Sequence, residues 1–174
     1  ASLALTDAVA FSNAIASAVN HKNIDLAETL IIVTADHSHV FTIAGYPTRG
    51  NPILGKVISN DSAGNPEQTP ALDLNDMPYT TVGYTNGQGV WLEGTQLDKN
   101  AAGRVDLTAI DTTDKGFYQE AMVPLGSETH AGEDVGIYAV GPWAHLFQGT
   151  LEQNLIFHVM DYAGQLSQGA QAKL

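Results

Sequence analysis

An unbroken apolar run constrains the fold of this chain more than any other feature. The run TLIIVT extends from Thr29 to Thr34 and is rich in β-branched residues, which is typical of a strand buried on both faces of a parallel sheet. Residues 4–19 precede it and are predicted to form an amphipathic helix. Their apolar side chains recur at steps of three to four residues on one face: Leu5, Val9, Ile15 and Val19. A helix followed by a buried strand indicates an α/β fold.

The composition changes after Gly45. Residues 46–120 are rich in Pro, Gly, Asn, Asp and Thr. They contain short strand-like pieces at Tyr79–Tyr84 and Val90–Leu92, and Asn86-Gly87 between them is a strong turn signal. This segment is interpreted as an inserted, loop-rich subdomain.

The last part of the chain returns to the α/β pattern. Residues 134–140 are predicted to form a strand that Gly141-Pro142 ends, and residues 150–166 a second helix, with Thr150 and Gln153 as a capping box. We therefore predict three parts: a core segment at 1–45, an insertion at 46–120 and a second core segment at 121–174.

Charge and cysteine content exclude several classes of function. The chain has 19 acidic and 7 basic residues, for a formal net charge of −12, so nucleic acid is not an expected partner. It has no cysteine, so a metal site must use His, Asp or Glu. An anionic substrate would need bound cations to reverse the local field. With no run of eighteen apolar residues and no visible signal peptide, we expect no membrane-spanning segment, although a signal on a longer precursor could have been removed.

The sequence Ala35-Asp36-His37-Ser38-His39 follows the apolar run directly. Ligands of open α/β sheets lie beyond the carboxyl ends of the strands, and Asp36 and His37 can share one metal ion if the strand ends there and the chain turns. The residues alone leave a second interpretation open, in which Asp36 caps a turn and the histidines are ordinary polar residues at the rim.

The second motif is Glu128-Thr129-His130-Ala131-Gly132-Glu133-Asp134. It places His130 in a polar loop just before a predicted strand, and Gly132 allows a tight backbone turn. A lone loop histidine is more often solvated than bound to metal, so this motif is weak by itself.

The two motifs together resemble the alkaline phosphatase family, especially its animal-type members. The resemblance includes VTADHSHVFTIAGYPTRG, SETHAGEDVGIYAVGPWAHLFQG, the opening ALTDAVAFSNAI and the helix EQNLIFHVM, and runs from about residue 4 to 166. The intervening PYTTVGYTNGQGV resembles the crown subdomain of the family. The fold that this implies is part of a three-layer sandwich with a mostly parallel central sheet, plus an inserted crown.

The resemblance implies roles for four residues. Asp36 and His37 match the pair that binds the zinc ion beside the nucleophile, and His130 matches a ligand of the other zinc ion. His39 matches a histidine that orients a ligating carboxylate without touching metal. The cofactors implied are two Zn²⁺ and one Mg²⁺, with the magnesium ligands outside this chain. No metal-binding role is expected for the remaining histidines, His21, His145 and His158. Glu133 and Asp134 match the motif but are expected to be structural.

The family hydrolyses phosphate monoesters through a phosphoserine and releases inorganic phosphate. Ser38 and Ser127 do not match the nucleophile, and Arg49 and Arg104 lie in or near the crown, away from the family's phosphate clamp. No catalytic residue is therefore expected in this chain, which we predict to be inactive without an amino-terminal half. The resemblance further implies a homodimer and a periplasmic or secreted location.

Two alternatives stay open. The chain can act as a non-catalytic dimerisation or interaction module, because the crown-like part survives complete. It can also be part of a related phosphodiesterase or mutase, although the crown argues against that.

Overall fold

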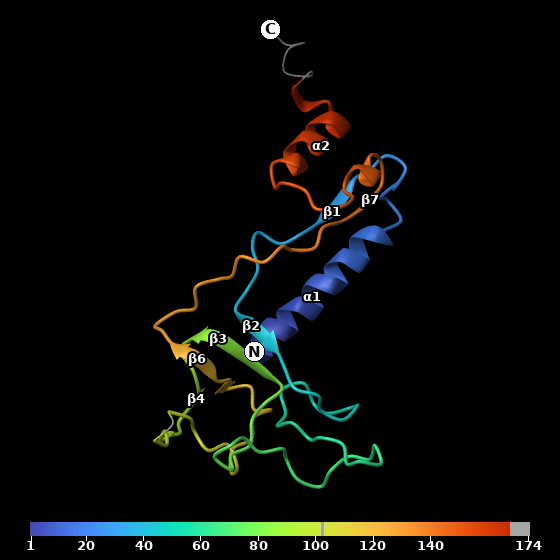
Figure 1. The fold of residues 1–174 in the computed structure, drawn as a ribbon. Helices are drawn as coiled ribbons and strands as arrows, with labels where there is room; N and C mark the ends of the chain where they lie inside the picture. Colours follow the sequence, from blue (N-terminus) through green and yellow to red (C-terminus); the bar gives the residue numbers. More distant parts are fainter. Residues whose placement is uncertain (102, 168–174) are drawn as a thin grey trace. The chain divides into compact units, whose positions relative to one another are not determined.

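The computed structural model describes residues 1–101 and 103–167, and its contacts divide the chain into two compact units. The first unit comprises Ala1–Val9 and His39–Gly132, and the second comprises Ala10–Ser38 and Glu133–Leu174. Helix α1 (Ser2–Val19) contributes residues to both. Figure 1 gives the order of the elements along the chain. The predicted division at residues 45 and 120 stays a prediction.

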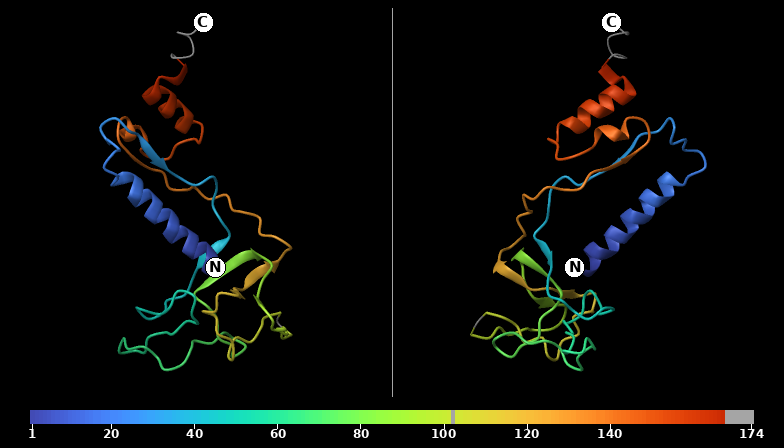
Figure 2. Two further views of the ribbon diagram at one scale, coloured as in Figure 1. Left: turned by 180° about the vertical axis from the view of Figure 1, so that it is seen from behind. Right: turned by 45° about the vertical axis from the view of Figure 1, so that its right-hand side comes forward.

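A three-stranded mixed sheet organises the first unit. Strand β3 (Val82–Gly87) lies between β2 (Phe41–Ile43), to which it is antiparallel, and β6 (Ala121–Pro124), to which it is parallel. Both views of Figure 2 show the green arrow of β3 beside the orange arrow of β6. Tyr84 lies opposite Phe41 on one side and Ala121 on the other. The sheet therefore joins three segments that are far apart in the sequence.

The hydrophobic core of the first unit lies beside a short ladder. Strand β4 (Trp91–Leu92) pairs antiparallel with β5 (Phe117–Tyr118). Val105, Leu107 and Phe117 are buried together, with four partly buried apolar side chains packed against them: Val90, Leu92, Leu97 and Ile110. Their burial removes apolar surface from water and stabilises an otherwise irregular part of the chain.

The same tight turn occurs three times in the loops of the first unit. In each turn the side chain of the first residue accepts a hydrogen bond from the backbone N–H of the fifth residue. The first and fifth residues are Asp61 and Asn65, Asp73 and Met77, and Asn100 and Arg104. The backbone N–H of each first residue also donates to the fifth residue's carbonyl, over 2.8 to 2.9 Å. Carboxylate and amide side chains close such turns by replacing a backbone acceptor. These turns account for the predicted loop-rich character of residues 46–120.

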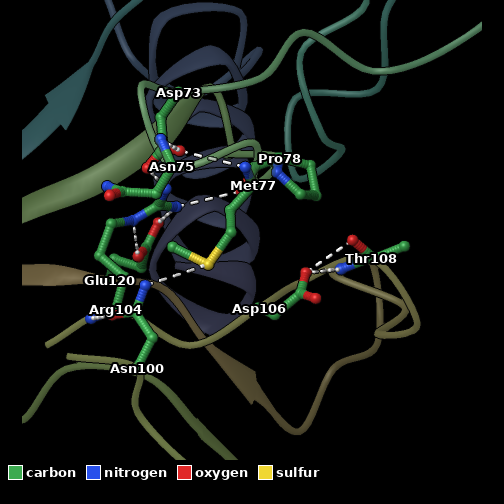
Figure 3. Close-up of polar contacts among 9 residues, drawn as sticks. All are labelled: Asp73, Asn75, Met77, Pro78, Asn100, Arg104, Asp106, Thr108 and Glu120. Atoms are coloured by element: carbon green, nitrogen blue, oxygen red, sulfur yellow. Dashed lines mark hydrogen bonds and ion pairs between the residues drawn. The ribbon is translucent and has the colours of Figure 1, made fainter. Parts of the chain in front are cut away.

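Arg104 connects separate segments of the first unit (Figure 3). Its guanidinium donates two hydrogen bonds of 2.7 Å to the carboxylate of Glu120 and one of 3.0 Å to the carbonyl of Pro78, and it also pairs with Asp73. The planar fork of an arginine suits such multiple acceptors. These contacts give Arg104 a structural role that the sequence alone did not indicate.

The second unit contains a two-stranded antiparallel ladder. Strand β1 (Ile31–Val33) pairs with β7 (Tyr138–Val140), with Ile32 opposite Ala139. A 3₁₀ turn η1 (Ala144–Leu146) and helix α2 (Leu155–Gly164) follow. Gly141 has a φ of 104°, and a Cβ there would lie 2.0 Å from the carbonyl oxygen of Thr29. Only glycine allows the two backbones to approach this closely.

Two local predictions from the sequence are wrong. Asn86 and Gly87 form no hairpin turn but end β3, because the strand continues beside β6 and the Asn86 side chain bonds to Thr129. The second helix begins at Leu155 rather than at residue 150. Its N-cap is Asn154, which makes no side-chain capping bond, so the predicted capping box of Thr150 and Gln153 does not form.

The α/β class is consistent with the helices and small mixed sheets of the described residues. Strand β1 is half-buried and has only the antiparallel partner β7 within this part of the chain. Its parallel neighbours were predicted to come largely from an amino-terminal half outside this chain, so the three-layer sandwich stays a prediction.

Helix α1 bears on the expectation of no membrane span. It is 18 residues long and, by length and composition alone, apolar enough to cross a membrane. A single such helix near the beginning of a chain is weak evidence, because signal sequences and core helices of soluble proteins pass the same test.

Candidate metal centre

Asp36 and His37 form an adjacent pair of metal-type ligands just beyond β1. The Oδ2 atom of Asp36 lies 3.3 Å from the Nε2 atom of His37. The carbonyl of Ser38 lies 2.7 Å from His37 Nδ1, and because a carbonyl only accepts, it selects the tautomer with its proton on Nδ1. The lone pair of the imidazole is then on Nε2, the nitrogen nearest Asp36. The carboxylate of Asp36 is 84% exposed, so an ion can reach it.

The segment around this pair is tied to the residues that precede β7. The hydroxyl of Thr34 donates to the carbonyl of Gly136 over 3.1 Å. The hydroxyl of Ser38 donates to the carboxylate of Glu133, which holds the pKa of Glu133 below its usual value. Both contacts lie within the second unit and restrain the loop that carries Asp36 and His37. They agree with the structural role predicted for Glu133.

His130 lies in the first unit, in a loop whose backbone is held from two sides. Its φ is 62°, a left-handed conformation that costs a non-glycine residue energy and persists only where neighbours enforce it. The backbone N–H of His130 donates to Oε2 of Glu128 over 2.6 Å. The side chain of Asn86 accepts the N–H of Thr129 over 3.1 Å and donates to its hydroxyl over 2.9 Å.

Glu128 gathers the histidines of the first unit around one carboxylate. Its Oε1 atom lies 2.7 Å from His130 Nδ1, and its Oε2 atom lies 3.5 Å from His39 Nε2. Ligand-type atoms of these three residues all lie within 4.8 Å of one another. The backbone N–H of His130, followed by the positive charge that each histidine can carry, lowers the pKa of Glu128. The carboxylate is therefore held in its charged, accepting form.

A cavity of about 390 Å³ in the first unit reaches this cluster. His39, Glu128, Tyr84 and Lys115 contribute to its wall. Burial, with the nearby Glu128 charge, raises the pKa of Tyr84, so its phenol stays a neutral hydrogen-bonding group. The cavity gives the cluster an open approach.

The structure distributes the predicted site residues over both units. Asp36 and His37 belong to the second unit, whereas His39 and His130 belong to the first. His39 contacts the carboxylate of Glu128. Sequence reasoning missed Glu128 and Asn86. Glu128 stands two residues before the predicted ligand His130 in the quoted motif, and this proximity was the only available signal.

Comparisons with known proteins place the chain beside one enzyme family. The sequence model described as "Alkaline phosphatase" matches residues 1–166. The chain is 43% identical over 136 residues to a protein named "Alkaline phosphatase, tissue-nonspecific isozyme" of Gallus gallus, an alignment that covers 78% of this chain and 23% of that protein. It is 41% identical over 142 residues to "Alkaline phosphatase" of Gadus morhua, covering 82% of this chain and 26% of the relative. The chain is 38% identical over 161 residues to the tissue-nonspecific isozyme of Homo sapiens, an alignment that covers 92% of this chain and 27% of that protein. The chain thus spans about a quarter of the length of the curated relatives it matches.

Proposed function

This chain belongs to the alkaline phosphatase family, and from that premise we propose that it supplies the carboxyl-terminal, metal-binding part of a phosphomonoesterase. The proposed substrate is a phosphate monoester and the proposed products are inorganic phosphate and an alcohol. The nucleophilic serine and the phosphate-binding arginine would come from the remaining part of the enzyme.

The observation that carries this proposal is the pairing of Asp36 with His37. Two ligand atoms that each lie about 2.0–2.1 Å from a tetrahedral zinc ion are about 3.3 Å apart. The separation of Asp36 Oδ2 and His37 Nε2 is 3.3 Å, and the Nδ1 contact to the Ser38 carbonyl places the lone pair on Nε2. Carboxylate oxygen with imidazole nitrogen is a donor set that zinc accepts. The pair therefore fits one zinc ion.

We assign His130 to the second zinc ion of the same two-metal site on the strength of the family match, which spans both motifs. Bound zinc ions would stabilise charge on the attacking and leaving oxygens of phosphoryl transfer. The role of this chain is to supply part of each ligand set and to keep those ligands oriented. A magnesium ion, if present, would take its ligands from outside this chain.

A reconstitution assay tests the proposal. The chain is combined with the amino-terminal portion of a related alkaline phosphatase, and hydrolysis of p-nitrophenyl phosphate is measured with zinc and magnesium at alkaline pH. We expect turnover with the wild-type chain and a loss of at least about 10²-fold with His37→Ala, since a metal ligand is removed. His21→Ala is the matched control, because His21 is exposed in a turn. Equal activity of both variants would contradict the proposal.

We further propose that the enzyme is a homodimer and that residues 46–120 contribute to its interface. Several large apolar side chains of this segment are exposed: Tyr46, Ile53, Leu72, Leu74, Trp91 and Tyr118. Such surface is typical of association sites. Deleting the segment should weaken self-association in sedimentation experiments more than it lowers zinc binding. A periplasmic or secreted location is proposed from the family alone.

A further inference from the structure

We propose that Glu128 is the positioning residue of His130, and that it fixes the tautomer that presents Nε2 of this histidine to a metal ion. His39 completes the arrangement from the other side of the same carboxylate. This inference deepens the proposed function, because it takes His130 as a zinc ligand.

Glu128 accepts from His130 twice. One oxygen lies 2.6 Å from the backbone nitrogen of His130, and the other lies 2.7 Å from its Nδ1. A carboxylate at this distance is an acceptor, so the proton of the neutral imidazole is on Nδ1 and the lone pair is on Nε2. Histidine ligands of metals characteristically donate their other N–H to a carboxylate or a carbonyl, which fixes the ring and makes it a better ligand.

His39 is oriented as a second donor to Glu128. Its Nδ1 accepts the backbone N–H of Phe41 over 3.3 Å. The proton of the neutral ring is therefore on Nε2, which lies 3.5 Å from Glu128 Oε2. In that tautomer His39 Nε2 has no lone pair for a metal. The same contacts keep both oxygens of Glu128 facing donors, so the cluster functions as a support for His130 and not as a three-ligand metal site.

The backbone of the loop reinforces the effect of the carboxylate. The side chain of Asn86 makes two hydrogen bonds with Thr129, the residue between Glu128 and His130. Glu128 is itself largely covered, with its side chain 23% exposed. A ring held by a carboxylate on a loop that is fixed at β3 has little freedom to turn, which lowers the entropy lost when metal binds.

The test uses the 174-residue chain with Glu128→Gln, which keeps the shape of the side chain but replaces one acceptor oxygen by an NH₂ donor. Long-range ¹H–¹⁵N NMR spectra of the metal-free protein at pH 8.5 report the His130 tautomer directly. We expect wild-type protein to show the Nδ1–H form and Glu128→Gln to shift toward Nε2–H. Competition with a chromophoric chelator should show zinc affinity lowered by about 10- to 100-fold.

Glu67→Gln is the matched control, because it removes the same charge from an exposed position of the same unit. It should leave the tautomer unchanged and zinc affinity within about twofold. Glu128→Ala, checked for folding by its amide spectrum, provides a second variant and should behave as Glu128→Gln does.

An unchanged tautomer and affinity in both Glu128 variants would overturn the inference. So would a zinc-loaded spectrum in which Nδ1 of His130 binds the metal and Glu128 ligates it. Equal reconstituted activity of wild-type chain and His37→Ala would instead count against the proposed function, while the metal-free tautomer judges the Glu128–His130 pairing separately.

Discussion

Arg104 bridges two carboxylates and a backbone carbonyl that come from different segments of the first unit (Figure 3). Its side chain is only 23% exposed, so the acceptors around it have limited access to water. Contacts to Glu120, then to Asp73, raise the pKa of Arg104 above its usual value. The guanidinium therefore remains charged at every pH at which the protein is folded.

We expect Arg104→Ala to lower the free energy of unfolding by about 1–3 kcal/mol, because charged acceptors lose their donors. Arg104→Lys should restore only part of the lost unfolding free energy, since one ammonium group cannot replace the several N–H donors of the planar guanidinium. Urea denaturation followed by circular dichroism measures both. Arg49→Ala, at an exposed arginine of the same unit, is the control and should change stability by less than about 0.5 kcal/mol. An equal effect at both positions would contradict the structural role of Arg104.

Asp73 makes stability depend on pH in the acid range. The backbone N–H of Met77, then that of Asn75 and the charge of Arg104, lower the pKa of Asp73 to about 2 from a model-compound value of 3.8. A carboxyl group with a depressed folded-state pKa stabilises the protein above its unfolded pKa, and that contribution is lost as the pH falls through the folded value.

Wild-type protein should therefore lose stability as the pH is lowered from about 4 to 2, and Asp73→Asn should lose less over the same window. Near neutral pH the variant should be the less stable of the two. Urea midpoints measured at intervals of half a pH unit provide the test. Parallel pH profiles for wild-type and variant protein would show that Asp73 makes no such contribution.

The residues that bear on chemistry were predictable from the sequence to different degrees. Asp36, His37 and His130 were singled out by their motifs, and the close pairing of Asp36 with His37 follows from their adjacency at a strand end. Glu128 was not singled out, because its role depends on the left-handed backbone of His130. This backbone turns the imidazole ring back toward the carboxylate of Glu128. Nothing in local composition indicates that turn.

At the scale of elements, the turns of the first unit show how short polar motifs replace regular structure. The Asp61 and Asn100 turns each have glycine as the fourth residue, with φ of 86° at Gly64 and 83° at Gly103. Asp76 takes the same place in the Asp73 turn with φ of 58°. Aspartate tolerates this region better than most residues, which explains its use there.

We expect Gly64→Ala to destabilise the protein by about 1 kcal/mol, because alanine is strained at positive φ. Gly126→Ala is a matched control: a Cβ at either position meets nothing within 4 Å, and Gly126 is not among the positive-φ glycines. The control should be neutral or slightly stabilising, by up to about 1 kcal/mol. Thermal unfolding of the two variants isolates the effect of backbone conformation. Equal stabilities would mean that the turn is not formed as described.

Elements with strong periodic patterns were predictable, and their boundaries were less so. The helix predicted at residues 4–19 is observed as α1 at Ser2–Val19. The strand predicted from residue 134 is limited to Tyr138–Val140, because its partner β1 offers only three residues. Asn86-Gly87 has the composition of a turn, but pairing with β6 and the Thr129 contacts override that local preference. Tertiary contacts, absent from local composition, account for these differences.

At the scale of the whole molecule, the distribution of apolar surface differs between the units. Most buried apolar side chains of the described residues belong to the first unit, whereas Val159 is buried in the second. Helix α1 has no buried residue, and Phe11, Tyr138 and Phe157 are exposed. Such surface favours association with further protein. This agrees with a chain that spans about a quarter of its relatives' length.

We therefore predict that this 174-residue chain alone has no significant phosphatase activity. The resemblance to the family implies that no serine of this chain is the nucleophile and that no arginine of it is the phosphate clamp. In the proposed site each zinc ion would also lack part of its ligand set, and affinity falls when a site is incomplete. Groups that act as one catalytic unit are strongly non-additive, so the absence of several together leaves little residual rate.

The measurement is p-nitrophenyl phosphate hydrolysis by the purified chain, with zinc and magnesium at alkaline pH and with its identity established by intact mass. We expect a rate at the level of the buffer control, since metal ions held by partial ligand sets cannot position a nucleophile that the chain does not contain. Adding the amino-terminal portion of a related enzyme should restore turnover, and His37→Ala should abolish that gain. Turnover of about 1–10³ per second from the chain alone would mean that a group within it acts as the nucleophile. Ser38 and Ser127 would then be the first residues to replace, and loss of the rate in either variant would identify it.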